Sequence, residues 1–220
     1  MTVLPERLQG ARYRLSYDRP YLSTLLYSLV GIEKSGIGTM GVDASLRLYY
    51  DPEWVGTIGS VTLGGVLYHE VGHVLRAHHG RAEALGLTHD PVGGFIWNLA
   101  ADAEINDDLI AEHVNLPVGC VTPSVLGKKE GLTAEEYMEA AAKNIIKVPG
   151  PGNGACGSAS GHTQPWEDDP KSGEGLSSAE VELIKRQVAN DVKDAMSKQT
   201  GTVPGWLKRF ADELLSPKVN

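Results

Sequence analysis

Apolar residues recur at intervals of three and four along most of this chain, with polar residues between them. That spacing places apolar side chains on one face of a helix, which can then pack against a core. One such stripe consists of Val181, Ile184, Val188, Val192 and Ala195. The same spacing predicts helices over residues 5–17, 22–30, 61–79, 95–112, 133–146, 177–195 and 204–215.

One segment follows a different pattern. Residues 42–50 alternate well enough between apolar and polar positions to form a β-strand, and Asp51-Pro52 ends it. Residues 31–41 before this strand are rich in turn formers. The predicted fold class is therefore α+β and mostly α-helical, with a small β-sheet beside the 61–79 helix.

Local signals divide the rest of the chain. Capping boxes of the S/T-x-x-E type, which begin at Thr133 and Ser177, start two of the predicted helices. A loop is expected at 80–94, and glycine and proline crowd into residues 148–175, which predicts a long loop there. Residues 176–220 are expected to form C-terminal helices.

Composition narrows the class of protein. The 220 residues are 41% hydrophobic, which suits one domain over residues 1–220. A net charge of −8 without a basic cluster argues against nucleic-acid and anionic-membrane partners. We find neither a signal peptide nor a spanning segment in the sequence, and its two cysteines, Cys120 and Cys156, lack C-x-x-C spacing. These features predict a cytoplasmic protein that acts on proteins or peptides.

The chemistry centres on His69-Glu70-Val71-Gly72-His73, an H-E-x-x-H motif within a predicted helix. Residues four apart share a helix face, so both imidazoles can bind one zinc ion while Glu70 approaches water beside it. Glu70 is the expected general base, which later passes its proton to the leaving amine. The motif predicts a zinc-dependent hydrolase, most simply an endopeptidase with one Zn²⁺ per chain.

A catalytic zinc site has three protein ligands, so a third must lie elsewhere. His79 matches the last histidine of H-E-x-x-H-x-x-G-x-x-H, but Arg76 occupies the position of the required glycine. Glu104 on the next predicted helix is a further alternative, although it lies off the expected face.

The preferred third ligand is Asp102. Peptidases of the gluzincin type carry E-x-x-x-D on the helix after H-E-x-x-H, and the best match here is Asn98 with Asp102. Because asparagine is a poor anionic ligand, Asp102 is expected to bind the metal itself. Asn98 and Asn106 flank it at i−4 and i+4, where they could hold its carboxylate or donate to substrate.

Three further questions stay open in the sequence. The predicted 42–50 strand could offer a free edge to a peptide, or could be an ordinary sheet strand. Cys156 could be a latency thiol that blocks the metal, or an incidental cysteine in an exposed loop. Candidates for stabilising an oxyanion are His78, His79, Arg81, Tyr49 and His113.

Several segments together resemble a bacterial and phage family of metallopeptidase-like proteins. They are HEVGH at 69–73, WNLAADAEIN at 97–106, GLTAEEY at 131–137, CGS at 156–158 and PWE at 165–167. The resemblance implies a zincin-like metallopeptidase domain. Members typically carry a von Willebrand A-like domain after it, for which 220 residues leave no room.

Besides a metal-dependent hydrolase of a non-peptide amide, which shares every catalytic residue with a peptidase and cannot be separated from it by sequence, two interpretations of function compete. The first is a zinc metallopeptidase of gluzincin-like type. The second is a catalytically silent metal-binding module that works with a von Willebrand A-like domain or an ATPase partner. The intact Glu70 favours the enzyme, because a structural zinc site needs no glutamate beside a water and normally closes all four positions with protein ligands.

Overall fold

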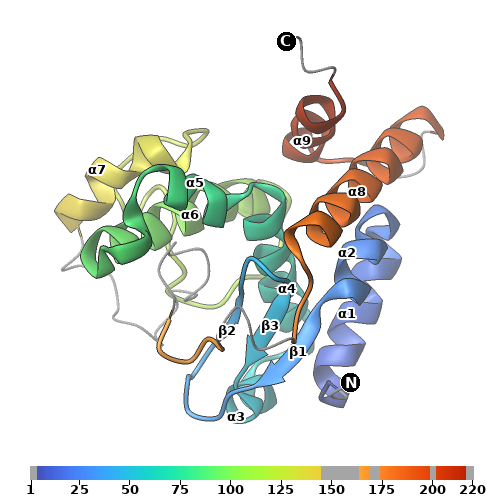
Figure 1. The fold of residues 1–220 in the computed structure, drawn as a ribbon, viewed down its shortest axis with the longest axis horizontal. Helices are drawn as coiled ribbons and strands as arrows, with labels where there is room; N and C mark the ends of the chain where they lie inside the picture. The colour runs from blue at the N-terminus through green and yellow to red at the C-terminus, as the bar shows by residue number, and fades with distance from the viewer. Residues whose placement is uncertain (1–3, 145–163, 169–173, 199–201, 217–220) are drawn as a thin grey trace.

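The computed structural model describes residues 4–144, 164–168, 174–198 and 202–216. Over these residues the chain is mostly helical with one small sheet, in agreement with the predicted α+β class (Figure 1). The α-helices are α1 (Glu6–Asp18), α2 (Ser23–Ser28), α3 (Pro52–Thr57), α4 (Ser60–Leu75), α5 (His78–Ala84), α6 (Pro91–Ala111), α7 (Ala134–Asn144), α8 (Ser178–Lys198) and α9 (Gly205–Leu215). The strands are β1 (Val30–Glu33), β2 (Met40–Val42) and β3 (Arg47–Tyr50), and the 3-10 helices are η1 (Pro20–Leu22) and η2 (Leu87–His89).

The sheet has the strand order β1-β3-β2, with β1 parallel and β2 antiparallel to β3. The prediction of one strand over 42–50 is wrong in extent, because β2 ends at Val42, Leu46 turns the chain at a φ of 59°, and β3 begins at Arg47. Most of β1 and part of β2 lie in the turn-rich segment 31–41, for which the sequence pattern predicted no strand. Every residue of β3 is buried, so burial and pairing hold these short strands rather than an alternating pattern.

The predicted helix over 61–79 is two helices. It ends at Leu75, Ala77 adopts the left-handed φ of 52°, and α5 then begins at His78. A left-handed alanine is disfavoured by about 1 kcal/mol, and nothing in the apolar spacing signals it. The prediction of a loop at 80–94 is also wrong. Most of α5, all of η2 and the start of α6 lie in this segment.

One helix boundary and one short helix also differ from the prediction. The helix expected over 22–30 ends at Ser28, and Val30 already belongs to β1. The short helix α3 was not predicted, although its signal is local: Asp51 caps it by accepting a 3.0 Å hydrogen bond from the amide of Glu53.

Both predicted capping boxes contribute bonds at their helix starts. The Glu136 carboxylate accepts from the Thr133 amide at 2.8 Å. Glu180 accepts from the Ser177 amide at 2.8 Å, and the Ser177 hydroxyl accepts from the Glu180 amide at 3.4 Å. These boxes place the starts of α7 and α8 correctly.

The buried apolar side chains form two clusters, and α6 contributes to both. Ile105 and Leu109 join the larger cluster with α1, α2, α4, the sheet, α8 and α9. Trp97 and Leu99 join the smaller one with residues of α7. Because α6 also packs along α4, side chains on these two helices face each other where the clusters meet.

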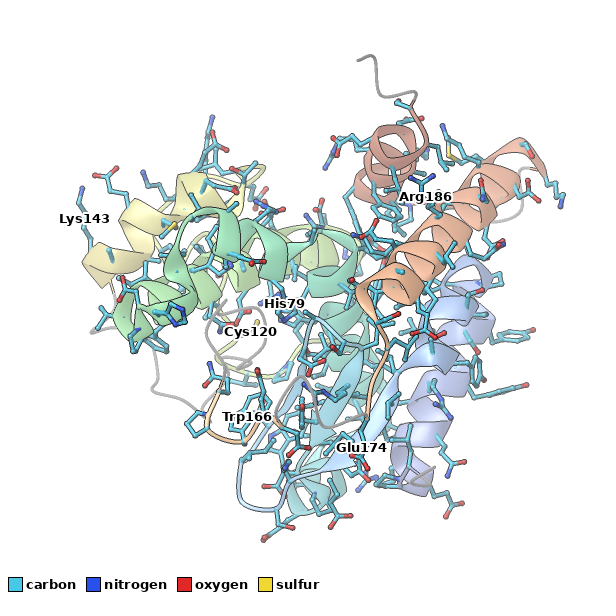
Figure 2. The ribbon with its side chains drawn as sticks, viewed as in Figure 1. His79, Cys120, Lys143, Trp166, Glu174 and Arg186 are labelled. Carbon is cyan, nitrogen blue, oxygen red and sulfur yellow. The ribbon has the colours of Figure 1, made fainter. Side chains whose placement is uncertain are left out.

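The described part of the predicted 148–175 loop lies against the sheet. Trp166 contacts Tyr49 of β3 edge to face, with ring centroids 5.1 Å apart (Figure 2). The amide of Asp168 donates to the Tyr49 hydroxyl at 3.1 Å. Most of the predicted loop lies outside the described residues. Of the helices described, none combines the length and apolar character needed to cross a membrane.

Glycines let α4 approach its neighbours closely. A Cβ on Gly65 would lie 2.0 Å from the backbone oxygen of Asn115, and one on Gly72 would lie 3.0 Å from the Ile105 side chain of α6. Gly64, by contrast, has nothing within 4 Å of that position. The helix that carries the H-E-x-x-H motif therefore depends on two glycines for its packing.

We expect Gly65→Ala to lower the free energy of unfolding by about 1–3 kcal/mol, because the backbone at Asn115 must move. Gly64→Ala is the matched control in the same helix, and it should leave stability unchanged or raise it by up to about 1 kcal/mol. Urea unfolding of both variants measures the difference. Equal stability of the two variants would contradict the close approach at Gly65.

Candidate metal centre

The two histidines of the motif lie on one face of α4. His69 is 6% exposed and His73 is fully buried. Their Nε2 atoms are 2.9 Å apart, as the four-residue spacing on a helix predicts.

Asp102 comes to this pair from α6. Its Oδ1 lies 3.4 Å from Nε2 of His69 and 3.2 Å from Nε2 of His73. In a tetrahedral zinc site with bonds of about 2.0–2.1 Å, ligand atoms lie roughly 3.3–3.4 Å apart. The two distances from Asp102 match this spacing, whereas the 2.9 Å between the imidazole nitrogens is shorter than it. Two imidazole nitrogens and one carboxylate oxygen are ligand atoms that zinc accepts.

Burial and hydrogen bonding set the charges in this cluster. Burial acts to raise the pKa of Asp102, but the adjacent His69 and His73 outweigh it and hold the pKa well below its ordinary range. Burial lowers the pKa of His73 well below 6.5. At neutral pH the cluster thus combines an ionised carboxylate with a neutral imidazole at His73, the forms that bind a metal.

Asn106, one turn after Asp102, orients His69. Its Nδ2 donates to the backbone oxygen of Val121 at 2.8 Å, so its Oδ1 faces Nδ1 of His69, also at 2.8 Å. An amide oxygen only accepts, so Nδ1 of His69 carries a proton, and in the neutral form of His69, the form that binds a metal, Nε2 presents a lone pair toward Asp102. Asn98, one turn before Asp102, is also buried.

His73 is in contact with a residue that the sequence did not single out for this position. Its Nδ1 lies 3.0 Å from Nδ1 of His78, which is fully buried at the start of α5. His78 in turn faces Glu104, with Nε2 and Oε2 3.5 Å apart. The left-handed turn at Ala77 brings His78 next to His73, and no local sequence pattern predicts that turn.

Glu70 is fully buried and joins the motif to the sheet. The amide of Val42 in β2 donates to Glu70 Oε2 at 3.1 Å. His79, labelled in Figure 2, donates from Nε2 to the backbone oxygen of Val42 at 3.1 Å. Within the 42–50 segment, β3 has no free edge because it is paired on both sides. β2 lies at an edge of the described sheet, and there Glu70 and His79 bind the amide and the carbonyl of Val42.

The alternative ligands lie elsewhere. His79 contacts Val42, and Glu104 accepts from Arg76 at 3.2 Å and from Arg81 at 2.9 Å. Burial acts to raise the pKa of Glu104, but the nearby His78, the hydrogen bond from Arg81 and the charge of Arg76 outweigh it, so that its pKa is well below normal. Among the described residues, the group that could hold a metal is His69, His73 and Asp102.

The oxyanion candidates do not form one group. Arg81 pairs with Glu104 and Glu135, and the Tyr49 hydroxyl donates to Asp43 at 3.2 Å. His113 is exposed after the end of α6. Cys156 lies outside the described residues, and Cys120 is a free thiol whose pKa burial and the Asp102 charge raise.

An H-E-x-x-H helix whose histidines meet a carboxylate from the next long helix is the arrangement of a candidate metal-dependent hydrolase. Residues 4–220 match the family described as "putative metallopeptidase domain", and the chain belongs to this family. No curated protein and no solved structure matches the chain.

Proposed function

We infer that this chain is a zinc-dependent endopeptidase whose ligands are His69, His73 and Asp102. The observation that carries the inference is the convergence of these three ligand atoms, all within 4.8 Å of one another, beside the buried Glu70. Three protein ligands leave a fourth position for water or substrate, which distinguishes a catalytic zinc site from a structural one. Membership of the metallopeptidase family supports peptide bonds as the substrate.

A zinc ion held here would polarise the scissile carbonyl and lower the pKa of water at the open position toward about 7. Glu70 would be the base that accepts a proton from a water molecule at this centre and later gives it to the leaving amine. The amide of Val42 holds one oxygen of Glu70, which orients the carboxylate. Asn106 keeps the lone pair of His69 directed at the centre.

The finer assignments follow from the same arrangement. The site is zincin-like, with Asp102 in the metal-ligand role that a glutamate has in gluzincins, and it binds one zinc ion per chain. A single domain, a cytoplasmic location and an association with a von Willebrand A-like domain or an ATPase stay predictions from the sequence.

The test is metal analysis joined to a cleavage assay on the purified chain. We expect about one zinc per chain, cleavage of an unfolded protein detected by mass spectrometry, loss of cleavage after chelation, and recovery when zinc returns. His89→Ala, which removes an exposed histidine near the motif, is the control and should behave as wild type. Zinc binding without any cleavage would favour the silent metal-binding module.

A further inference from the structure

We propose that His78 and Glu104 are positioning residues that fix the ring and the tautomer of His73, so that this histidine presents a lone pair to the metal. The inference rests on the metal centre inferred above. It concerns two residues that lie outside the ligand set and outside the H-E-x-x-H motif.

The chain of contacts begins at Glu104, which is 9% exposed and held from several sides. Besides Arg76 and Arg81, the amide of Ala134 at the start of α7 donates to its Oε2 at 2.6 Å. Contacts from three separate parts of the chain therefore fix this carboxylate in place. A carboxylate held by two arginines is ionised and can only accept hydrogen bonds.

The ionised Glu104 decides the tautomer of His78. Nε2 of His78 is buried, lies 3.5 Å from Glu104 Oε2, and has no hydrogen-bond partner among the described residues. A lone pair facing the carboxylate would be repelled, whereas an N–H facing it is attracted. The proton of a neutral His78 therefore lies on Nε2, and Nδ1 is left as an acceptor.

The tautomer of His78 then decides that of His73. Their Nδ1 atoms are 3.0 Å apart, so one must donate and the other accept. Because Nδ1 of His78 accepts, Nδ1 of His73 donates, and Nε2 of His73 carries a lone pair. The same result follows for His69 from Asn106, by an independent route.

Both arguments converge on one point inside the protein. Two imidazole lone pairs and a carboxylate oxygen face one another with separations of 2.9, 3.2 and 3.4 Å. Three acceptors at such distances repel one another, and a bound cation removes that repulsion. His78 and Glu104 thus prepare the centre for a metal before the metal arrives.

The main experiment measures Zn²⁺ affinity by competition with a chromophoric chelator. His78→Phe keeps the ring packing but removes the acceptor, and we expect it to weaken Zn²⁺ binding by about 10–100-fold. The rescue variant is His78→Asn, whose Oδ1 falls near the position of the lost Nδ1 and can accept the same proton. It should bind Zn²⁺ clearly more tightly than His78→Phe. Wild-type affinity in His78→Phe, or equal affinity in the two variants, would overturn the proposal.

Glu104→Gln tests the other residue of the pair. It keeps the shape of the side chain but loses the charge that sets the His78 tautomer, so we expect weaker Zn²⁺ binding and an altered visible spectrum of the Co²⁺-loaded protein. Glu135→Gln is the matched control, because Glu135 also pairs with Arg81 and contacts neither histidine. If the two variants behave alike, Glu104 has no part in positioning His73.

Nitrogen-15 spectra of the imidazoles in the metal-free wild type test the tautomers without any variant. We expect the proton of His73 on Nδ1 and that of His78 on Nε2, and the opposite pair would overturn the proposal. These readings need no peptidase activity. A chain that binds Zn²⁺ but cleaves nothing would therefore refute the proposed function and leave this inference standing.

Discussion

Replacement of Glu70 by glutamine is expected to lower the rate of peptide hydrolysis by about 10²–10⁴-fold and to leave the bound metal in place. Glutamine cannot take a proton from water, whereas the three ligand atoms come from other residues. The fold should also survive, because the amide oxygen of glutamine can still accept from Val42. Rates on an unfolded protein substrate, metal content and thermal unfolding together measure these effects.

Glu83→Gln is the control for this change, since it neutralises an exposed glutamate on α5. It should retain wild-type rates. Full hydrolysis by Glu70→Gln would remove Glu70 as the general base. Loss of metal in that variant would instead mean that Glu70 belongs to the ligand set.

Replacement of Asp102 by asparagine is expected to weaken Zn²⁺ binding by more than about 100-fold, since losing a ligand should cost more than losing a partner of a ligand. The two remaining imidazoles would keep no anionic ligand to offset the charge of the ion. Zinc content after dialysis and chelator competition measure the change. Hydrolysis should fall in parallel.

Asp108→Asn is the matched control, because this aspartate lies on the same helix and pairs with Arg76 rather than with the histidines. It should keep its metal. One tightly bound zinc per chain in Asp102→Asn would show that another group completes the site. His79 and Glu104 would then have to leave the partners they hold here.

Helix periodicity predicted most of the described helices. Some of them, such as α8, bury one stripe against a core, whereas α4 is buried at every position from Gly65 to Leu75. Periodicity failed where the chain departs from regular spacing. Ala77 takes a left-handed conformation, which an alanine in the sequence does not indicate. The apolar spacing therefore predicted one helix where the structure has α4 and α5. The short strands β1 and β2 lie mostly in a segment that is rich in turn formers. Their own residues do not signal strands, because pairing with the fully buried β3 stabilises them.

The site divides in the same way. His69, Glu70 and His73 could be placed together from the sequence, because a spacing of one helical turn is local geometry. Which of Asp102 and Glu104 approaches the two histidines depended on which face of α6 meets α4. The position of His79 depended on the turn at Ala77. His78 as the partner of His73 could not be predicted, because its position follows from the reversal at Ala77 and from packing between helices.

The sequence by itself determined that two histidines and a glutamate share one helix face, and that a second helix brings candidate carboxylates. Only the tertiary structure decided that Asp102 lies between the imidazoles, that Val42 holds Glu70, and that Glu104 instead faces His78. The physical reason is the distance along the sequence between the residues that interact. A helix turn is set by residues four apart, whereas these contacts form only when distant segments pack together.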